Sequence, residues 1–337
     1  MALGLFYQSS SRGGRDLSDV VAYPGEPNDY ASRSLDWLGA ILATGGLGAI
    51  TYGLIGASAG GAALWVGLAG VAALVGFFIV ERRSPAPMIS LHLFDSRDFT
   101  GANLLTFLLY APLSGMLFFL PLNLIQVQRY SAIQAGAALL PLILLIFILS
   151  RWSGGLVARY GARLPLTIGP LVAASGFALF LRPGIGGSYW NTFFPAVAVL
   201  GIGLAISVAP LTTAVMESVS SSEAGVASGI NNAVSRVAGL LAVALFGLIL
   251  SAGFNHALDR RLSRMKLAPA QLQSIDRQRP RLAGAQIDDL QITEAIDESF
   301  ISGFREVIWI SIAMTLLSAF SAQMIQSRVR LSAPPAA

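Results

Sequence analysis

The chain has 337 residues, of which 54% are hydrophobic and only 12% are charged, and it contains no cysteine. A soluble globular chain carries about 25% charged residues, whereas the apolar residues here fall into runs of about twenty, the length that spans a bilayer. These values predict an all-α polytopic membrane protein and exclude disulfides and Cys-ligated metals. We assign the formal net charge of +4 to arginines in cytoplasmic loops rather than to nucleic-acid binding.

The first hundred residues are predicted to combine a polar segment with two membrane-spanning helices. Residues 1–33 are rich in Ser, Gly, Asp, Pro and Arg, which is typical of a solvated segment. Apolar runs at 36–57 and 61–80 predict two transmembrane helices, and the many glycines of the first indicate close packing against a neighbour. With the Pro-containing loop that follows, these helices form a second region, 34–100.

Six further spans are predicted in residues 101–327. They lie at 101–126, 131–158, 164–181, 192–219, 224–251 and 304–325. A charged, Gln-rich stretch at 252–302 separates the last two and is predicted to be an outer loop with interfacial amphipathic pieces. The tail, 328–337, is predicted to be cytoplasmic. We therefore expect eight transmembrane helices.

Arginine placement orients these spans. Only Arg129 and Arg182 lie in the short loops of one side, whereas arginines such as Arg82, Arg83 and Arg151 crowd the other side. Cytoplasmic loops carry the excess of Lys and Arg, so the N-terminus is expected to be cytoplasmic. The long outer loop is also basic, but loops of that length constrain topology less.

The predicted span at 224–251 carries polar residues within its apolar sequence. Arg236 lies about 18 Å along this helix, near the middle of a hydrocarbon core about 30 Å thick. A charge there costs about 2.5 kcal/mol or more, so Arg236 is expected to face protein or a water-filled cavity. It either completes an ion pair or carbonyl cap at a packing seam, or it takes part in substrate or proton coupling. Asn231 and Asn232 are expected to form interhelical hydrogen bonds or to line the same cavity.

Small residues share one stripe of this helix with the polar groups. Spacings of three and four place on that stripe Gly225, Gly229, Asn232, Arg236 and Gly239. Small residues let another helix approach closely, so the stripe is predicted to pack inside a helix bundle.

A second polar face is predicted on the helix at 101–126. Its members repeat at helical spacing and are Asn103, Thr106, Tyr110 and Ser114. This face either lines a cavity or packs against a neighbouring helix. The candidates for cavity lining are Asn103, Tyr110 and, farther along the same helix, Asn123.

No catalytic motif accompanies these polar groups. The sequence contains no metalloprotease, nucleophile-elbow, P-loop or dinucleotide fingerprint, so neither an enzyme nor a cofactor is expected. The two histidines, His92 and His256, fall in predicted loops and are expected to be solvated rather than metal ligands. No acidic residue lies deep in a predicted span, although membrane proton relays use buried Asp or Glu.

The turn after the span at 131–158 reads GGLVARYGAR. It resembles the loop motif of the major facilitator superfamily, roughly G-x-L-x-D-R-x-G-R-R/K. The matching positions are Gly154, Leu156, Arg159, Gly161 and Arg163, while Ala158 and Ala162 replace an Asp and a basic residue. The resemblance implies that Gly154, Arg159, Gly161 and Arg163 form a cytoplasmic hinge.

Further stretches extend the resemblance along the chain. Four stretches are similar to fourteen-helix drug–proton antiporters of the EmrB/QacA type. They are SLDWLGAILATGGLGAITYGL, ERRSPAPMISLHLF, GIGLAISVAPLTTAVMESV and the AGVASGINNAVSRVAG that follows it. From about residue 34, the resemblance implies two linker helices and then a C-terminal lobe of two inverted three-helix repeats. The N-terminal lobe, with its coupling carboxylates, is not matched.

The resemblance implies part of a proton-coupled exporter of hydrophobic or cationic small molecules in a bacterial inner membrane. Its two lobes would rock about a midplane site, so transport requires a partner lobe, a homodimer or a longer gene product. The implied substrate and coupling cavity comprises Arg236, Asn232, Asn231, Asn103, Tyr110 and Asn123. The expected partners are the lipid bilayer, a small hydrophobic substrate and protons. The alternative is a truncated, non-transporting membrane protein or scaffold, which the missing carboxylates favour.

Overall fold

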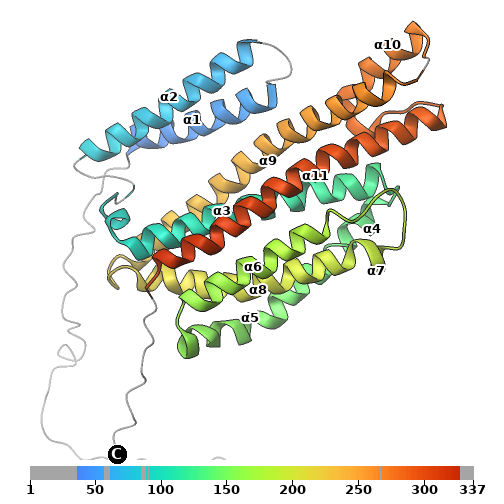
Figure 1. Cartoon of the computed structure of the whole chain (residues 1–337). Helices are drawn as coiled ribbons and strands as arrows, with labels where there is room; N and C mark the ends of the chain where they lie inside the picture. Colours follow the sequence, from blue (N-terminus) through green and yellow to red (C-terminus); the bar gives the residue numbers. More distant parts are fainter. Residues whose placement is uncertain (1–35, 57–60, 85–88, 90, 266, 327–337) are drawn as a thin grey trace, which may run out of the picture.

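The computed structural model describes residues 36–56, 61–84, 89, 91–265 and 267–326, which form helices joined by short connections (Figure 1). The long helices are α1 (Trp37–Ile55), α2 (Gly61–Arg83), α3 (Arg97–Gln126), α5 (Leu140–Tyr160), α6 (Arg163–Leu179), α8 (Phe194–Glu217), α9 (Ala224–Leu262) and α11 (Leu290–Ser321). The short ones are η2 (Leu91–Asp95), α4 (Ala132–Ala137), α7 (Tyr189–Thr192), α10 (Pro269–Gln278), η3 (Arg279–Gly284) and η4 (Ala322–Met324). The all-helical prediction is confirmed, while the predicted segments 1–33 and 328–337 lie outside the described residues.

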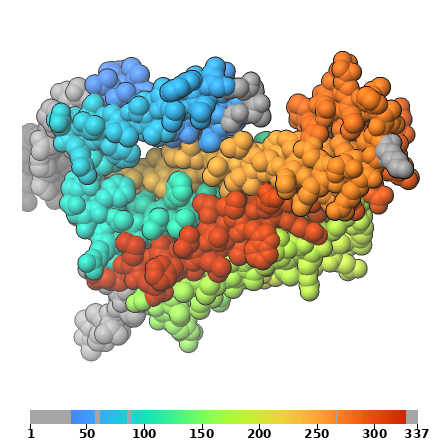
Figure 2. All heavy atoms as spheres, turned by 45° about the horizontal axis from the view of Figure 1, so that its top comes forward, coloured from blue at the N-terminus to red at the C-terminus, as the bar shows by residue number. Residues whose placement is uncertain are grey.

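The first two helices form a hairpin along one side of the molecule, where α1 contacts α9 (Figures 1 and 2). The hairpin packs through glycines. A Cβ added to Gly53 would lie 2.5 Å from the Cα of Gly67, and a Cβ added to Gly70 would lie 2.7 Å from the carbonyl oxygen of Gly46. No side chain larger than hydrogen fits between the two backbones at these points. The close packing predicted from the glycines of the first span is therefore confirmed.

The other six long helices form one bundle. Helix α8 packs against α5 and α6, α9 packs against α3 and α11, and α11 also contacts α3 and α6. The largest fully buried side chains of this core are aromatic or aliphatic and include Phe99, Phe177, Phe246, Phe300, Leu109 and Leu166. The bundle corresponds to the six spans predicted for residues 101–327. Their grouping into two inverted repeats stays a prediction.

Glycines set the closest contacts inside the bundle. A Cβ on Gly203 of α8 would lie 2.3 Å from the amide nitrogen of Ala173 in α6, and a Cβ on Gly303 of α11 would lie 2.5 Å from the carbonyl oxygen of Leu250 in α9. Lipid tails are as apolar as a leucine side chain, so membrane helices associate through such close van der Waals packing. These two contacts hold together the two main seams of the bundle.

Seven helical segments of the described part are long and apolar enough to cross a membrane, against the eight spans predicted. The remaining predicted span, 164–181, corresponds to α6, which has 17 residues. A helix of that length rises only about 26 Å, against a hydrocarbon core of about 30 Å. The predicted span 131–158 divides into α4 and α5, and the second part starts beside Pro141, whose nitrogen has no hydrogen to donate.

The outer connection is more helical than predicted. Helix α9 continues to Leu262 and α11 begins at Leu290, so most of the stretch 252–302 predicted as a loop is helix. Its sequence is polar because the helices there are amphipathic, with Leu258 and Ile296 buried between them. The amphipathic pieces predicted in this stretch are thus helices, two of which continue α9 and α11, because low hydropathy marks the end of an apolar span rather than the end of a helix.

Filling the seam between α6 and α8 is expected to destabilise the protein. In Gly203→Leu, the new side chain meets the α6 backbone, and overpacking of this kind costs about 1–3 kcal/mol. Thermal unfolding in detergent, followed by the loss of the monodisperse elution peak, would measure the effect. Gly48→Leu is the matched control, because a Cβ at Gly48 meets no atom within 4 Å. Equal melting temperatures for both variants would contradict the packing argument.

Candidate transport site

A polar cluster joins α9 to α3 inside the bundle. The side-chain amide of Asn231 donates to the hydroxyl oxygen of Thr106 at 2.6 Å and to the amide oxygen of Asn103 at 3.2 Å. Asn103 and Thr106 are buried, and each also donates to a backbone carbonyl one turn earlier in α3. All three side chains are therefore engaged. The sequence left two alternatives for Asn231, interhelical hydrogen bonds or cavity lining. The structure shows the interhelical hydrogen bonds.

The neighbouring Asn232 and Arg236 occupy a different face of α9. Both side chains are exposed, and the guanidinium of Arg236 forms no ion pair or hydrogen bond within the part of the chain that the structure describes. Along the same face, a Cβ on Gly225 or Gly229 would meet no atom within 4 Å, whereas a Cβ on Gly239 would lie 2.7 Å from the hydroxyl of Ser114 in α3. Only the outer end of the predicted stripe thus packs against a described helix.

Two further candidates lie on α3. Tyr110 is half-buried one turn beyond Thr106 and packs against the core. Asn123 is buried about 20 Å farther along the helix, where its amide oxygen accepts from Gln128 at 3.4 Å. Gln128 in turn bonds the backbone of the Gly-rich outer turn. The structure therefore places Asn123 in an outer-loop network, away from the Asn231 cluster.

The loop motif lies between α5 and α6. Gly161 ends α5 with φ +74°, a backbone conformation that favours glycine. Arg163 donates to the side-chain oxygen of Gln323 in η4, whose amide donates to Thr167 of α6 at 3.2 Å. Arg163 therefore ties the start of α6 to the end of α11. The other two motif residues, Arg159 and Gly154, are exposed, and the Arg159 guanidinium lies 5.3 Å from the ring centroid of the adjacent Tyr160.

At the same end of the molecule, His92, one of the two histidines predicted to lie in loops, contacts a carboxylate. His92 of η2 lies 2.8 Å from a carboxyl oxygen of Glu223, just before α9. Hydrogen bonds from Ser220 and from His92 lower the pKa of the Glu223 carboxyl below its usual range. This contact links the loop after α2 to the base of α9. Nothing in the spacing of two residues so far apart in sequence could have indicated it.

An ion pair with a buried carboxylate, at the other end of the bundle, was also missed. Arg129, after α3, donates to Asp297 of α11 at 2.8 Å. Only 5% of Asp297 is exposed, and its second carboxyl oxygen has no hydrogen-bond partner among the described residues. The sequence analysis placed Asp297 in the loop 252–302. The apolar spacing of Ile292, Ile296 and Phe300 was the signal that it lies on a helix with a buried face.

Comparison with known proteins identifies the family. The sequence profile described as the Major Facilitator Superfamily matches residues 34–243, more than half of the chain. The chain belongs to the Major Facilitator Superfamily. Members of this superfamily are multi-pass membrane transporters and are generally not enzymes.

Drug-resistance proteins are among the relatives of this superfamily chain. The multidrug resistance protein Stp of Mycobacterium tuberculosis is 27% identical over 92% of this chain and 60% of that protein. The tetracenomycin C resistance and export protein of Streptomyces glaucescens is 27% identical over 86% and 56%. The puromycin resistance protein pur8 of Streptomyces alboniger is 34% identical over 64% and 44%. The chain thus spans about three fifths or less of the length of these relatives.

A solved structure supports the same fold. A bacterial homologue of the human lysosomal transporter Spinster, crystallised inward-facing and unoccupied, superposes with a TM-score of 0.53 at 16% identity. The match covers 86% of this chain and 69% of that one. At this identity the likeness concerns the fold alone.

Removing the amide of Asn231 is expected to loosen α9 from α3. Asn231→Ala leaves the buried Asn103 and Thr106 without their interhelical donor, which lowers the free energy of unfolding by about 1 kcal/mol. Asn232→Ala is the matched control, since the exposed Asn232 side chain donates to neither α3 residue. Thermal unfolding in detergent compares the two. A control as unstable as Asn231→Ala would show that the cluster contributes nothing specific.

Removing only one partner of the Arg129–Asp297 ion pair is expected to lower the free energy of unfolding more than removing both partners. Arg129→Gln leaves the buried Asp297 carboxylate without its counterion, and we expect a loss of about 1–3 kcal/mol, because Arg129 itself is half exposed. The double variant Arg129→Gln/Asp297→Asn removes the stranded charge and should recover part of this loss. Strictly additive destabilisation in this double-mutant cycle would refute the pairing.

Proposed function

We propose that this chain provides the linker helices and C-terminal lobe of a proton-coupled exporter of hydrophobic or cationic small molecules, of the fourteen-helix type, in a bacterial inner membrane. The observation that carries the proposal is the uncovered face of α9 with Arg236 in its middle. A charge at that depth cannot face lipid at low cost. We infer that a second lobe covers this face and encloses the transport cavity.

The geometry of α9 supports a second lobe. Gly225 and Gly229 present backbone without side chains on the same face as Asn232 and Arg236, and such a surface admits another helix at close range. In transporters of this kind, lobes rock about a site near the midplane. Asn232 and Arg236 would then face the site, with Tyr110 beside it on α3. A further segment of a longer protein, a separate chain or a second copy could supply the covering lobe.

The names of the relatives suggest the substrate class. Proteins that confer resistance to tetracenomycin C and to puromycin, and one named as an export protein, match this chain. We extend small-molecule efflux to the present chain on that ground. The buried carboxylates of the described residues, Glu81 and Asp297, lie toward the ends of α2 and α11, so we propose that the carboxylate coupled to protons belongs to the second lobe.

A non-transporting scaffold is the second candidate. It is favoured by one specific observation, namely that no carboxylate of the described residues pairs with Arg236. In that case the exposed face of α9 would bind another membrane protein without any cavity between them.

Export of a fluorescent lipophilic cation, with and without a protonophore, separates the two candidates. The full chain is expressed with a second lobe taken from a relative, and efflux is followed in intact cells. We expect protonophore-sensitive efflux that Arg236→Ala lowers about tenfold or more, since a hydrogen bond to a charged group contributes about 1.5–3 kcal/mol. Arg277→Ala is the control, because Arg277 lies on the exposed outer helix α10.

Each result has a distinct meaning. Unchanged efflux in Arg236→Ala would place this arginine outside the substrate and coupling path. No efflux from a well-inserted wild-type chain, with the second lobe present, would favour the scaffold. Equal amounts of each variant in the membrane fraction are required before the rates are compared.

A further inference from the structure

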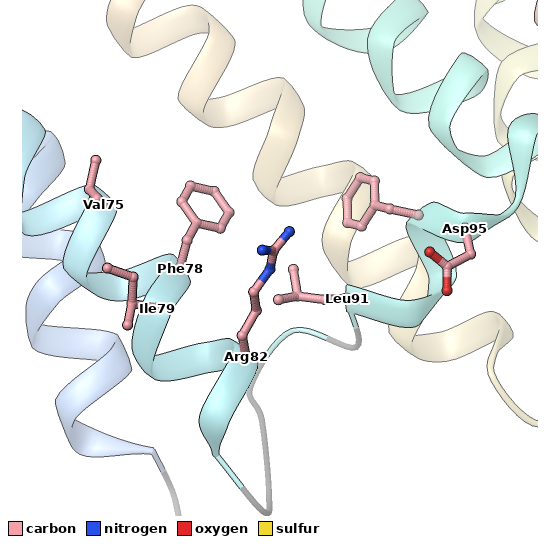
Figure 3. Close-up of a pocket in the computed structure, with 7 residues that line it drawn as sticks. Val75, Phe78, Ile79, Arg82, Leu91 and Asp95 are labelled. Carbon is pink, nitrogen blue, oxygen red and sulfur yellow. The ribbon is translucent and has the colours of Figure 1, made fainter.

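A groove opens between the last turns of α2 and η2 (Figure 3). It has a volume of about 530 Å³ and is lined by four residues of α2 and three of η2. Most of the lining is apolar, including Phe78, Ile79 and Leu91, and two charged side chains, Arg82 and Asp95, complete it. Nothing in the proposed transport cycle uses this groove, because it lies on the linker hairpin rather than on the exposed face of α9.

The two charged residues of the groove lie on opposite sides of it and do not pair. Arg82 reaches between Phe78 and Leu91, and Asp95 lies on the other side of the groove (Figure 3). Both residues are exposed, and neither forms an ion pair with the other or with another described residue. A ligand that carries both a negative and a positive group would complement both.

An apolar stripe leads from the groove along α2. Leu68, Val71, Val75 and Phe78 are about half exposed, and their spacing of three and four puts them on the face that ends at Arg82. Val71 lies about 16 Å along the helix from Arg82, which is close to half of a hydrocarbon core about 30 Å thick. The part of the stripe between Val71 and Arg82 therefore has about the length of one acyl chain in one leaflet.

We propose that this groove binds a phospholipid whose headgroup carries a primary amine beside its phosphate, as phosphatidylethanolamine does. The Arg82 guanidinium donates to the phosphate oxygens, and the Asp95 carboxylate accepts from the ammonium group. The acyl chain lies on the stripe of α2. A lipid with a net negative headgroup and no amine, such as phosphatidylglycerol, satisfies Arg82 but leaves Asp95 facing a second negative charge, so it binds more weakly.

Native mass spectrometry of the full chain in detergent tests this site. Phosphatidylethanolamine and phosphatidylglycerol with identical acyl chains are added in turn, and the bound fractions are compared. We expect about a tenfold preference for the amine lipid in the wild-type chain, about the worth of one charge-assisted hydrogen bond. Asp95→Asn should bring the two lipids to about equal binding, and Arg82→Gln should weaken both.

Arg83→Gln is the matched control, because Arg83 lies in the same last turn of α2 and does not line the groove. We expect it to bind both lipids as the wild type does. A phosphatidylethanolamine with a photoreactive acyl chain should also crosslink to α2, which tests the location in the unaltered chain. Equal binding of the two lipids by the wild type, an Arg83→Gln variant as weak as Arg82→Gln, or crosslinks confined to other helices would each overturn the proposal.

Discussion

The direction in which Arg236 points is the constraint on which the proposed function depends, because we propose that this guanidinium lies within the depth of the membrane. Arg236 lies about 18 Å along α9, and exposure to lipid at that depth costs about 2.5 kcal/mol or more. The rotation of α9 about its axis decides where this charge points. Asn231 contributes to that orientation through its bonds to Thr106 and Asn103 of α3, together with the buried apolar face of α9. Five residues later, Arg236 lies about 140° around the helix and faces away from α3.

Small residues have two different roles in this bundle. Gly303 and Gly203 sit at seams where neighbouring backbones leave no room for a Cβ, while Gly225 and Gly229 have open space in front of them. The first pair explains how the bundle holds together in lipid, where packing replaces the hydrophobic driving force. The second pair has the same chemistry and no described neighbour. A face that another helix can approach closely, next to a charged side chain, supports the second lobe that we propose.

The apolar spans could be predicted from sequence because their length and polarity follow from the thickness of the bilayer, whereas the polar continuations of α9 and α11 could not. Helical periodicity also showed that Asn232 and Arg236 share a face. Periodicity could not show which helix packs against that face, because tertiary packing decides this. The same role was therefore predicted for Asn231 and Asn232, although only Asn231 forms hydrogen bonds to α3. Asp297 was missed for another reason: polar sequence was taken as loop, although α11 starts at Leu290 and buries that carboxylate. The contact of His92 with Glu223 joins residues too distant in sequence for any local pattern to reveal.

The contacts of α9 differ in strength between its two ends. At the outer end, α9 packs against α11 with backbone contacts at Gly303, and a change there requires two helices to separate. At the cytoplasmic end, the charged link to the linker is the exposed contact between His92 and Glu223, and exposed pairs contribute little to stability. The inner half of α9 is held by buried apolar residues such as Ala227, Ile230 and Ala238 together with the hydrogen bonds of Asn231 to α3. Gly225, Gly229 and Arg236 lie on the uncovered face of this inner half, so the second lobe that we propose would add its contacts where α9 has no backbone seam like that at Gly303.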